Sequence, residues 1–431
     1  MSKSIGRYVH LQGGFAFKSS DFKDSGIPLI RISNITNNGL DKTEAMLLPY
    51  EYQNELKDFL AQENDTLIAM SGATTGKCCL IKERDLPCLI NQRVGRFKIL
   101  NEKEVDKVFV FYVVNSQEFQ NELLKDAIGG AQPNVSPKQI ERINWDFPKY
   151  QAQRRIALIL TTCDAVIEKT QAAIAKYKAI KQGMLHDLFT RGIDITTGKL
   201  RPKYADAPEL YKESKLGFIP KEWNVEMIGD VSSLVTNGFV GVATPYYTTA
   251  DQGVPYLFGT NIREDSIEFN DLRYISREFN SSHVKSQLKP GDMLCVQSGH
   301  IGTCAVVPDN FVEANCHALI ITRFYKEMIY PEFISFYLNS SIGKHQLDKI
   351  IIGSTIKHIN TSDLAKHLIP KPPVDEQKGI SKRLRIIDQK HHTEQNYLHK
   401  LQQLKAGLMG NLLSGSKKVS VPEEVLTQTE N

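Results

Sequence analysis

Residues 151–191 read QAQRRIALILTTCDAVIEKTQAAIAKYKAIKQGMLHDLFTR, and residues 375–414 read DEQKGISKRLRIIDQKHHTEQNYLHKLQQLKAGLMGNLLS. In both stretches, apolar-leaning positions recur in alternating steps of four and three, the heptad pattern of a long helix packed along another helix. The first series is Ile156, Leu160, Cys163, Ile167, Thr170, Ile174, Tyr177, Lys181, Met184 and Leu188, and the second is Ile380, Leu384, Ile387, His391, Glu394, Leu398, Leu401, Lys405, Leu408 and Leu412. Each position of the second series lies 224 residues after its partner, so the sequence predicts two copies of one long helix, each roughly 58 Å long.

Both stretches are bounded as helices commonly are, with proline before them and glycine after them. The prolines are Pro148 for the first stretch and Pro370, Pro372 and Pro373 for the second, and the glycines are Gly192 and Gly415. A helix of this length needs a partner along its length, because an isolated helix gains little stability in water. We therefore expect the two helices to pack against each other in antiparallel directions as a coiled-coil-like spacer.

The chain outside these stretches is also repeated. Residues 26–34 (GIPLIRISN) match residues 253–261 (GVPYLFGTN), and residues 65–72 (DTLIAMSG) match residues 292–299 (DMLCVQSG). The first pair predicts a turn and a short strand, and the second predicts a buried strand that leads into a Ser-Gly loop. The order is therefore globular, helix, globular, helix, and the fold class is α+β. We expect a pseudo-two-fold axis to relate the two globular α/β domains, which the two long helices separate.

The composition is that of an ordinary globular protein, with 41% hydrophobic and 24% charged residues in a chain of 431. The net charge is +4, but residues 1–150 carry 19 basic and 19 acidic side chains, and residues 201–372 carry 17 and 19. Any nucleic-acid binding must therefore use a local surface rather than bulk charge. The sequence has no apolar run of the roughly 20 residues that span a bilayer, and residues 1–7 lack the apolar core of a signal peptide. We expect a cytoplasmic protein that does not bind membranes.

Motifs for binding a metal or a cofactor are missing from the sequence. The seven cysteines form no C-x-x-C pair, and Cys295, Cys304 and the neighbours Cys316 and His317 have the wrong spacing for zinc, so we expect free thiols. Residues 72–78 (GATTGKC) are one residue shorter than a P-loop and have cysteine where the metal-binding hydroxyl belongs. We predict no metal, no cofactor and no catalytic residue in this chain.

Polar residues recur on equivalent loops of the two halves. Asn, Gln, Arg and Lys side chains can read base edges by paired hydrogen bonds, while Ser and Thr hydroxyls can hold phosphates. The candidate DNA-binding residues are Ser71, Thr74, Thr75, Lys77, Asn91, Gln92, Arg93, Gln132 and Asn134 in the first half and Ser298, His300, Asn315, His317, Ser354, Thr355, Lys357 and His358 in the second. Ordinary loop and capping chemistry would account for at least half of these residues.

Several motifs together resemble those of type I restriction–modification specificity subunits. They are residues 353–360 (GSTIKHIN) with 370–377 (PKPPVDEQ), their first-half counterparts 130–136 and 148–153, residues 220–230 (PKEWNVEMIGD), residues 291–294 and the Ser298-Gly299 pair. The resemblance extends over nearly the whole chain. The first half departs from it, because it begins near Gly6 without a counterpart of Trp223.

The resemblance implies a chain without catalytic activity, in which each globular domain reads one half of a bipartite, asymmetric target on double-stranded DNA. The helices would set the distance between the half-sites and dock two methyltransferase subunits, and restriction subunits that consume ATP would join the complex. The expected division is residues 1–150 and 223–372 for target recognition, 151–192 and 373–415 for the helices, 193–222 for a linker and 416–431 for a disordered tail.

Two other interpretations remain open. A duplicated α+β chain with a coiled-coil stalk could be a protein-interaction scaffold that never touches DNA, which a shift assay with duplex DNA and the methyltransferase partner would test. A stand-alone modification enzyme is disfavoured, because the sequence has neither the G-x-G-x-x-G fingerprint nor the acidic-Pro-Pro-aromatic motif with which adenine methyltransferases hold a flipped base.

Overall fold

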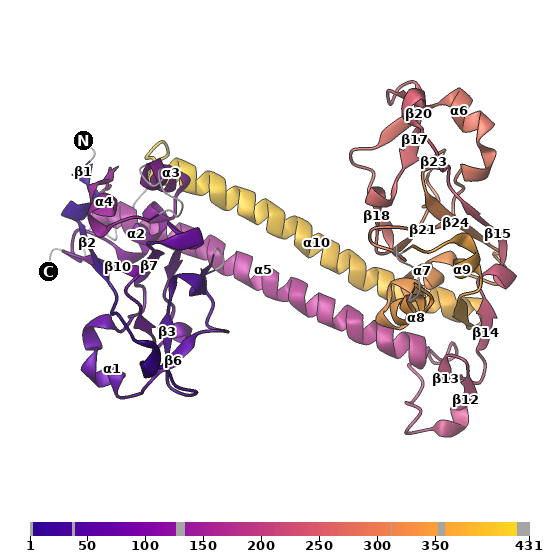
Figure 1. The fold of residues 1–431 in the computed structure, drawn as a ribbon, viewed down its shortest axis with the longest axis horizontal. Helices are drawn as coiled ribbons and strands as arrows, with labels where there is room; N and C mark the ends of the chain where they lie inside the picture. The colour runs from indigo at the N-terminus through magenta and orange to yellow at the C-terminus, as the bar shows by residue number, and fades with distance from the viewer. Residues whose placement is uncertain (1–2, 37–38, 126–133, 312, 352–357, 420–431) are drawn as a thin grey trace. The chain divides into compact units, whose positions relative to one another are not determined.

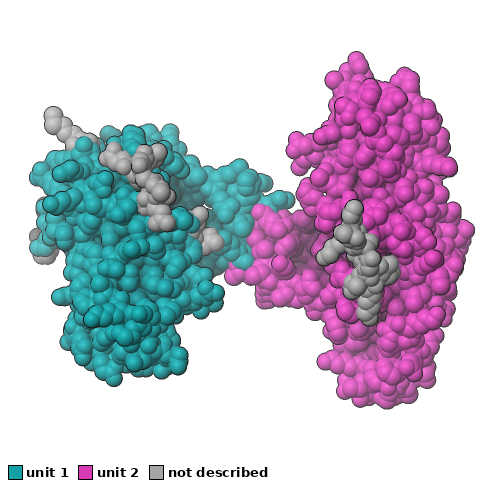
Figure 2. Space-filling model, viewed as in Figure 1, with its two compact units in different colours: residues 1–171, 396–431 teal, residues 172–395 magenta. Residues whose placement is uncertain are grey.

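The computed structural model describes residues 3–36, 39–125, 134–311, 313–351 and 358–419 (Figure 1). The fold mixes helices and sheets in two compact units, residues 1–171 with 396–431 and residues 172–395, which Figure 2 colours separately. The two long helices are α5 (Tyr150–Thr190) and α10 (Val374–Leu413), and each contributes one part to either unit. Both helices lie where the heptad pattern predicts them.

The first unit contains a four-stranded antiparallel sheet. In spatial order its strands are β2 (Val9–Gly13), β10 (Val94–Ile99), β7 (Thr66–Ala69) and β8 (Cys78–Leu80). A second sheet has three strands, β6 (Met46–Leu48), β3 (Ile27–Ile30) and β9 (Leu89–Ile90). Two further sheets have two strands each, β1 (Lys3–Ser4) with β11 (Asn144–Trp145) and β4 (Ile35–Thr36) with β5 (Gly39–Leu40). The shorter helices are α1 (Tyr52–Glu55), α2 (Lys107–Val114), α3 (Gln117–Lys125) and α4 (Pro137–Arg142). The largely apolar α2 packs on β7 and β8, which explains why most of its side chains are buried.

The second unit repeats this order of strands. Its four-stranded antiparallel sheet consists of β15 (Ser232–Asn237), β24 (Leu319–Phe324), β21 (Met293–Val296) and β22 (Cys304–Val306). A second four-stranded sheet consists of β16 (Tyr247–Thr248), β20 (Arg273–Ser276), β17 (Gly253–Leu257) and β23 (Asn315–Cys316). Three further sheets have two strands each. They are β14 (Asn224–Met227) with β25 (Leu368–Lys371), β18 (Ile262–Arg263) with β19 (Ser266–Ile267), and β12 (Tyr211–Ser214) with β13 (Gly217–Pro220). The helices are α6 (Arg277–Ser282), α7 (Pro331–Asn339), α8 (Ser341–Ile351) and α9 (Thr361–Ala365).

Each unit buries part of both long helices in its own core. In the first unit, Leu160 of α5 and Leu412 of α10 share a core with Phe109 of α2. In the second unit, Leu188 of α5 and Leu384 of α10 share a core that also contains other apolar side chains of α7 and β24. Packing onto a sheet domain therefore stabilises the ends of both helices.

The helix seam is less buried between these anchored ends. Of the predicted seam residues, Ile156, Leu160, Leu188, Leu384, Ile387 and Leu412 are buried, whereas Ile167, Ile174, Leu398, Leu401 and Leu408 are half-buried. Two helices alone can cover only one face of each other, so side chains in the middle of the seam keep contact with solvent.

The two lysines that interrupt the seam form equivalent ion pairs. In the second unit, the ammonium of Lys181 is 2.7 Å from the carboxylate of Asp388, and in the first unit that of Lys405 is 2.5 Å from Asp164. Each pair joins α5 to α10, and each ammonium also lies over an aromatic ring, on α7 and α2 respectively. The polar interruption of the heptads therefore fixes the register of the two helices inside each unit.

Residues 193–222, which we expected to be a linker, are folded and contain the β12–β13 hairpin. The guanidinium of Arg201 lies 2.6 Å from the buried carboxylate of Glu376, to which the indole N–H of Trp223 donates at 3.1 Å. Gly192 is required here, because its φ is +64° and a Cβ would approach Glu376 to 2.2 Å. The segment is packed because Glu376, at the start of α10, needs buried partners.

The expected disordered tail falls mainly on residues 420–431, outside the described part of the chain, while Val419 packs against the first-unit core. All seven cysteines are without a disulfide partner in the structure, and six of them are buried. In the described ranges, no helix combines the length and the apolar character that crossing a membrane requires.

Candidate nucleic-acid interface

Three loops of the first unit meet at the carboxyl end of β7. The backbone N–H of Met70 donates to the Arg93 carbonyl at 3.0 Å, and the N–H of Val135 donates to the Met70 carbonyl at 2.9 Å. Ser71 and Asn134 face each other across an isolated β-bridge. The structure therefore brings Ser71, Arg93 and Asn134 together, and the side chains of Arg93 and Asn134 are exposed.

The loop that follows β7 is held in shape by its own hydroxyls. The Thr74 hydroxyl donates to the Ile32 carbonyl at 3.1 Å, and the Thr75 hydroxyl donates to the Gly72 carbonyl at 2.7 Å. Because both protons are used inside the protein, these threonines shape the loop rather than donate to phosphates. Lys77, at the end of the loop, is half-buried.

The remaining first-unit candidates differ in exposure. Gln92 is exposed, whereas Asn91 is half-buried and its side-chain oxygen lies 3.5 Å from the backbone nitrogen of Arg93, which donates to it. Four predicted residues lie outside the described part of the chain, so the structure places none of them: Gln132, Ser354, Thr355 and Lys357.

A matching set of loops lies at the carboxyl end of β21 in the second unit. The N–H of Ile359 donates to the Gln297 carbonyl at 3.2 Å, and that of Phe239 donates to the Cys316 carbonyl at 2.9 Å. The loops after β15 and β21 and the segment before α9 are therefore held at this end of the sheets. Three predicted residues, Ser298, His300 and His358, are exposed on these loops.

The structure corrects the prediction for Asn315. Its side chain is fully buried, with the amide nitrogen donating to the Asn280 side chain at 2.9 Å and the amide oxygen accepting from the Cys316 N–H at 2.8 Å. An amide whose hydrogen bonds are satisfied inside the domain is not available to a base edge. Asn315 therefore belongs to the scaffold of the loops.

His317, next along the chain, remains available. It is half-buried, and its Nδ1 atom lies 3.1 Å from the hydroxyl of Tyr256. Burial lowers the pKa of His317, which favours the neutral form of its imidazole. The residue can therefore offer DNA a hydrogen bond from its imidazole.

Two glycines that the sequence analysis did not select bring the loops after β2 and β15 to the interfaces. They are Gly14, after β2, and Gly238, after β15. A Cβ on Gly14 would lie 2.2 Å from the Ile90 carbonyl, and one on Gly238 would lie 2.7 Å from the Cys316 carbonyl. Only glycine allows the backbone to approach so closely. The sequence contains a pattern that could have indicated these loops, because a Gly-Phe pair occurs at residues 14–15 and again at residues 238–239.

An aspartate–arginine pair supports the strands behind each interface. Arg96 lies 3.3 Å from Asp65 in the first unit, and Arg323 forms two hydrogen bonds with Asp292, of 2.7 and 2.6 Å, in the second. In both pairs the aspartate precedes the third strand of the four-stranded sheet, and the arginine lies on the strand next to it. These arginines are occupied within the domains and are not candidates for DNA contact.

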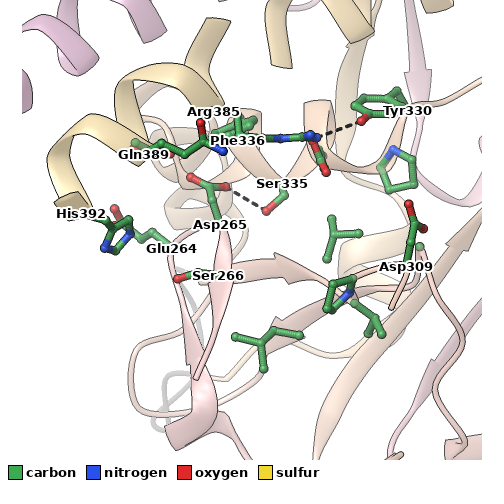
Figure 3. Close-up of a pocket in the computed structure, with 18 of the residues that line it drawn as sticks. Glu264, Asp265, Ser266, Asp309, Tyr330, Ser335, Phe336, Arg385, Gln389 and His392 are labelled. Carbon is green, nitrogen blue, oxygen red and sulfur yellow. Dashed lines mark hydrogen bonds and ion pairs between the residues drawn. The ribbon is translucent and has the colours of Figure 1, made fainter. Parts of the chain in front are cut away.

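A cleft of about 430 Å³ lies in the second unit, between α7, α10 and the β18–β19 hairpin (Figure 3). Asp265, at the turn of the hairpin, accepts hydrogen bonds from the Ser335 hydroxyl at 2.9 Å and from the Asn339 amide at 2.7 Å. Burial raises the pKa of Asp265 to about 6, although the Lys181 ammonium 3.4 Å away opposes the rise. The buried carboxylate connects the hairpin to α7 and α5, so we assign it a structural part within the second unit.

Comparison with known proteins identifies the family. The model of the type I restriction modification DNA specificity domain matches residues 2–177 and 220–403, which is most of the chain. This chain belongs to the type I DNA specificity family. The resemblance inferred from the motifs is thereby confirmed, and the DNA-specificity function is supported over a scaffold that never touches DNA.

Relatives of this type I specificity protein are similar over most of their length. The type I restriction enzyme MjaVIII specificity subunit of Methanocaldococcus jannaschii is 24% identical over 368 residues, which cover 84% of this chain and 81% of the relative. The type I restriction enzyme EcoBI specificity subunit of Escherichia coli is 23% identical over 388 residues, which cover 88% and 77%. In fold, the chain is similar to the crystal structure of the type I restriction–modification S subunit from M. genitalium, with a TM-score of 0.63, 14% identity and coverage of 97% and 96%.

Proposed function

We propose that this specificity protein reads a bipartite, asymmetric target on double-stranded DNA, one half-site with each globular half. Residues 1–150 and 223–372 are the two recognition domains in this proposal. The observation that carries it is the repeat: both units have the same order of strands, and in both the polar loops meet at the end of the third strand of the sheet. Because the side chains on these loops differ between the halves, two different half-sites are expected.

The long helices, residues 151–192 and 373–415, would set the distance between the half-sites and dock two methyltransferase subunits. The large apolar side chains exposed on these helices are the candidates for the docking contacts, since a partner subunit would remove their apolar surface from water. They are Leu158, Tyr397 and Leu404 in the first unit and Ile180 and Ile386 in the second. Both units carry such side chains, so the proposal assigns one methyltransferase subunit to each unit, and ATP-consuming restriction subunits would join this assembly.

A pseudo-two-fold relation between the halves is also part of the proposal. Lys405 follows Lys181 by 224 residues, and Asp388 follows Asp164 by the same number. Each lysine pairs with the aspartate of the other helix, so one ion pair becomes the other when the halves are exchanged. Exchange of this kind is what a two-fold axis between two antiparallel helices would produce.

The proposal assigns no catalytic step to this chain. Methyl transfer and DNA cleavage would be the work of the partner subunits, in keeping with the names of the relatives as specificity subunits. Since the target is chromosomal DNA, the proposal places the protein in the cytoplasm.

Genome-wide mapping of methylated adenines in the source strain, with and without this gene, tests the function. We expect a bipartite methylated motif that disappears on deletion and returns on complementation. Exchanging residues 223–372 for the same region of a relative should then change one half-site and leave the other intact. Methylation that survives deletion would exclude the proposed function, and a change of both half-sites would exclude independent recognition domains.

A further inference from the structure

One arginine of the second half is held rigidly without an acidic partner. Arg273 begins β20, and its guanidinium lies over the rings of Tyr247 and Phe258, with its central carbon 5.3 Å from each ring centroid. Its Nη1 also donates to the Tyr247 hydroxyl at 3.2 Å. Two aromatic contacts and a hydrogen bond orient the guanidinium plane, while the side chain remains exposed.

The other arginines in residues 201–372 all have a carboxylate partner. They are Arg201 with Glu376, Arg263 with Glu268, Arg277 with Glu313 and Arg323 with Asp292. Arg273, by contrast, forms no ion pair with any residue that the structure describes. This region as a whole has a small net negative charge, with 17 basic and 19 acidic side chains.

The position of Arg273 connects it to the candidate interface. It lies opposite Tyr256 in the β17–β20 ladder, so the two side chains are on the same face of the sheet. The Tyr256 hydroxyl contacts His317, and the ring of Phe258 lies 5.2 Å from the imidazole of His317. The guanidinium and the available imidazole are therefore connected through one layer of aromatic rings.

The geometry favours a base over a phosphate as the partner of this guanidinium. A phosphate can be neutralised by a mobile lysine or arginine, and the contact carries no sequence information. A bidentate contact to the O6 and N7 atoms of guanine needs a planar donor pair in a fixed orientation, which arginine provides. With one N–H donated to Tyr247, the other N–H groups of Arg273 remain free to make such a contact.

We propose that Arg273 is a specificity-determining residue that reads a guanine in the half-site of the second recognition domain. The inference rests on the proposed function, because it assumes that this domain faces DNA. It deepens that function by naming one base and the side chain that recognises it.

The test uses the full chain with its methyltransferase partner and a library of DNA targets with randomised half-sites. Methylation is measured for the wild-type protein and for the variants Arg273→Ala and Arg273→Lys. We expect both variants to lose roughly 10- to 100-fold of the preference for guanine at one position of one half-site. Lysine should not restore the preference, because it keeps the charge but lacks the planar pair of donors. The other half-site should be unchanged and serves as an internal control.

A matched control is Arg263→Ala, which removes an exposed arginine that is already paired with Glu268. It should leave the preferences at both half-sites intact, and melting curves should show that all variants are folded.

Uniform weakening of binding to every DNA sequence, with a salt slope lower by about 1, would identify a phosphate contact and overturn the inference. Unchanged preference in Arg273→Ala would also overturn it. If the wild-type protein has no sequence preference in the library, the proposed function itself fails. If the wild-type protein prefers two half-sites and Arg273→Ala keeps both preferences, only the inference about Arg273 fails.

Discussion

At the scale of single residues, the two halves use the same glutamine to begin their long helices. The buried side chain of Gln377 donates to the carbonyls of Pro372 and Met328, at 2.8 and 3.0 Å, and accepts from the Tyr330 N–H at 2.8 Å. In the first half, Gln153 makes the equivalent three hydrogen bonds to the Pro148 and Glu104 carbonyls and the Asp106 N–H. One side chain thus attaches the helix start to the loop before α7 or α2.

We predict that Gln377→Ala destabilises the protein by roughly 1–3 kcal/mol, because buried backbone groups lose their partner. Urea unfolding of the variant and of the wild type measures the effect. The control is Gln402→Ala, at an exposed position of the same helix, which should change the free energy of unfolding by about 0.5 kcal/mol or less. Equal effects of the two substitutions would contradict the importance of this contact.

Asp265 should make stability depend on pH. Its pKa is about 6 in the folded protein, raised by burial from an ordinary value of 3.8, so the folded state holds more protons than the unfolded state between these values. The protonated Asp265 therefore contributes its full stabilisation below about pH 4. As the pH rises to about 6 this contribution is lost, and the free energy of unfolding falls by up to roughly 3 kcal/mol.

The variant Asp265→Asn should lack this part of the pH dependence. Urea midpoints measured from pH 4 to 7 would show a smaller decline for the variant than for the wild type. Asp309→Asn, at an exposed position of the same cleft, should follow the wild-type profile. A decline in Asp265→Asn as large as in the wild type would show that another group is responsible.

At the scale of elements, the strength of the helix seam varies along its length. Leu384 is fully buried in the second-unit core, whereas Leu398 is half-buried in the part of α10 between the cores. Cavity cost grows with the space that a removed side chain leaves enclosed. The seam should therefore tolerate truncation better in the middle than at the anchored ends.

We expect Leu384→Ala to cost about 2–5 kcal/mol and Leu398→Ala clearly less, because solvent can enter the second site. Both residues are leucines at seam positions of α10, so the comparison is matched in chemistry. Urea unfolding of the two variants gives the difference. A greater loss from Leu398→Ala would mean that the middle of the seam, and not the domain cores, holds the helices together.

At the scale of the whole molecule, the proposed spacer makes a quantitative prediction. Inserting one heptad after Thr170 and another after Glu394 keeps the seam in register and lengthens each helix by about 10 Å. The half-sites should remain the same, while the preferred gap between them grows by about three base pairs, at roughly 3.4 Å per base pair.

Methylation of a target library with randomised gap lengths measures the preferred gap. Inserting the heptad in only one helix is the control. This insertion makes the two helices unequal in length, so the seam residues beyond it no longer face their partners and folding should be impaired. If the preferred gap does not move in a doubly extended variant that folds and binds its methyltransferase, the helices are not the ruler.

The sequence by itself determined the repeated plan, both long helices and the buried strands at residues 66–69 and 293–296. These features depend on patterns of apolar residues within a short stretch, and the repeat showed each pattern twice. The family could be inferred for the same reason, since its motifs are local strings of residues.

Only the tertiary structure decided which polar residues are available at the interface. Asn315 and Arg273 are both polar residues on strands of one sheet, yet the first is enclosed by hydrogen bonds and the second is exposed on aromatic rings. The folded state of residues 193–222 likewise depends on Glu376, more than 150 residues away along the chain. Burial and pairing arise from contacts between distant segments, and a local pattern of residues does not contain them.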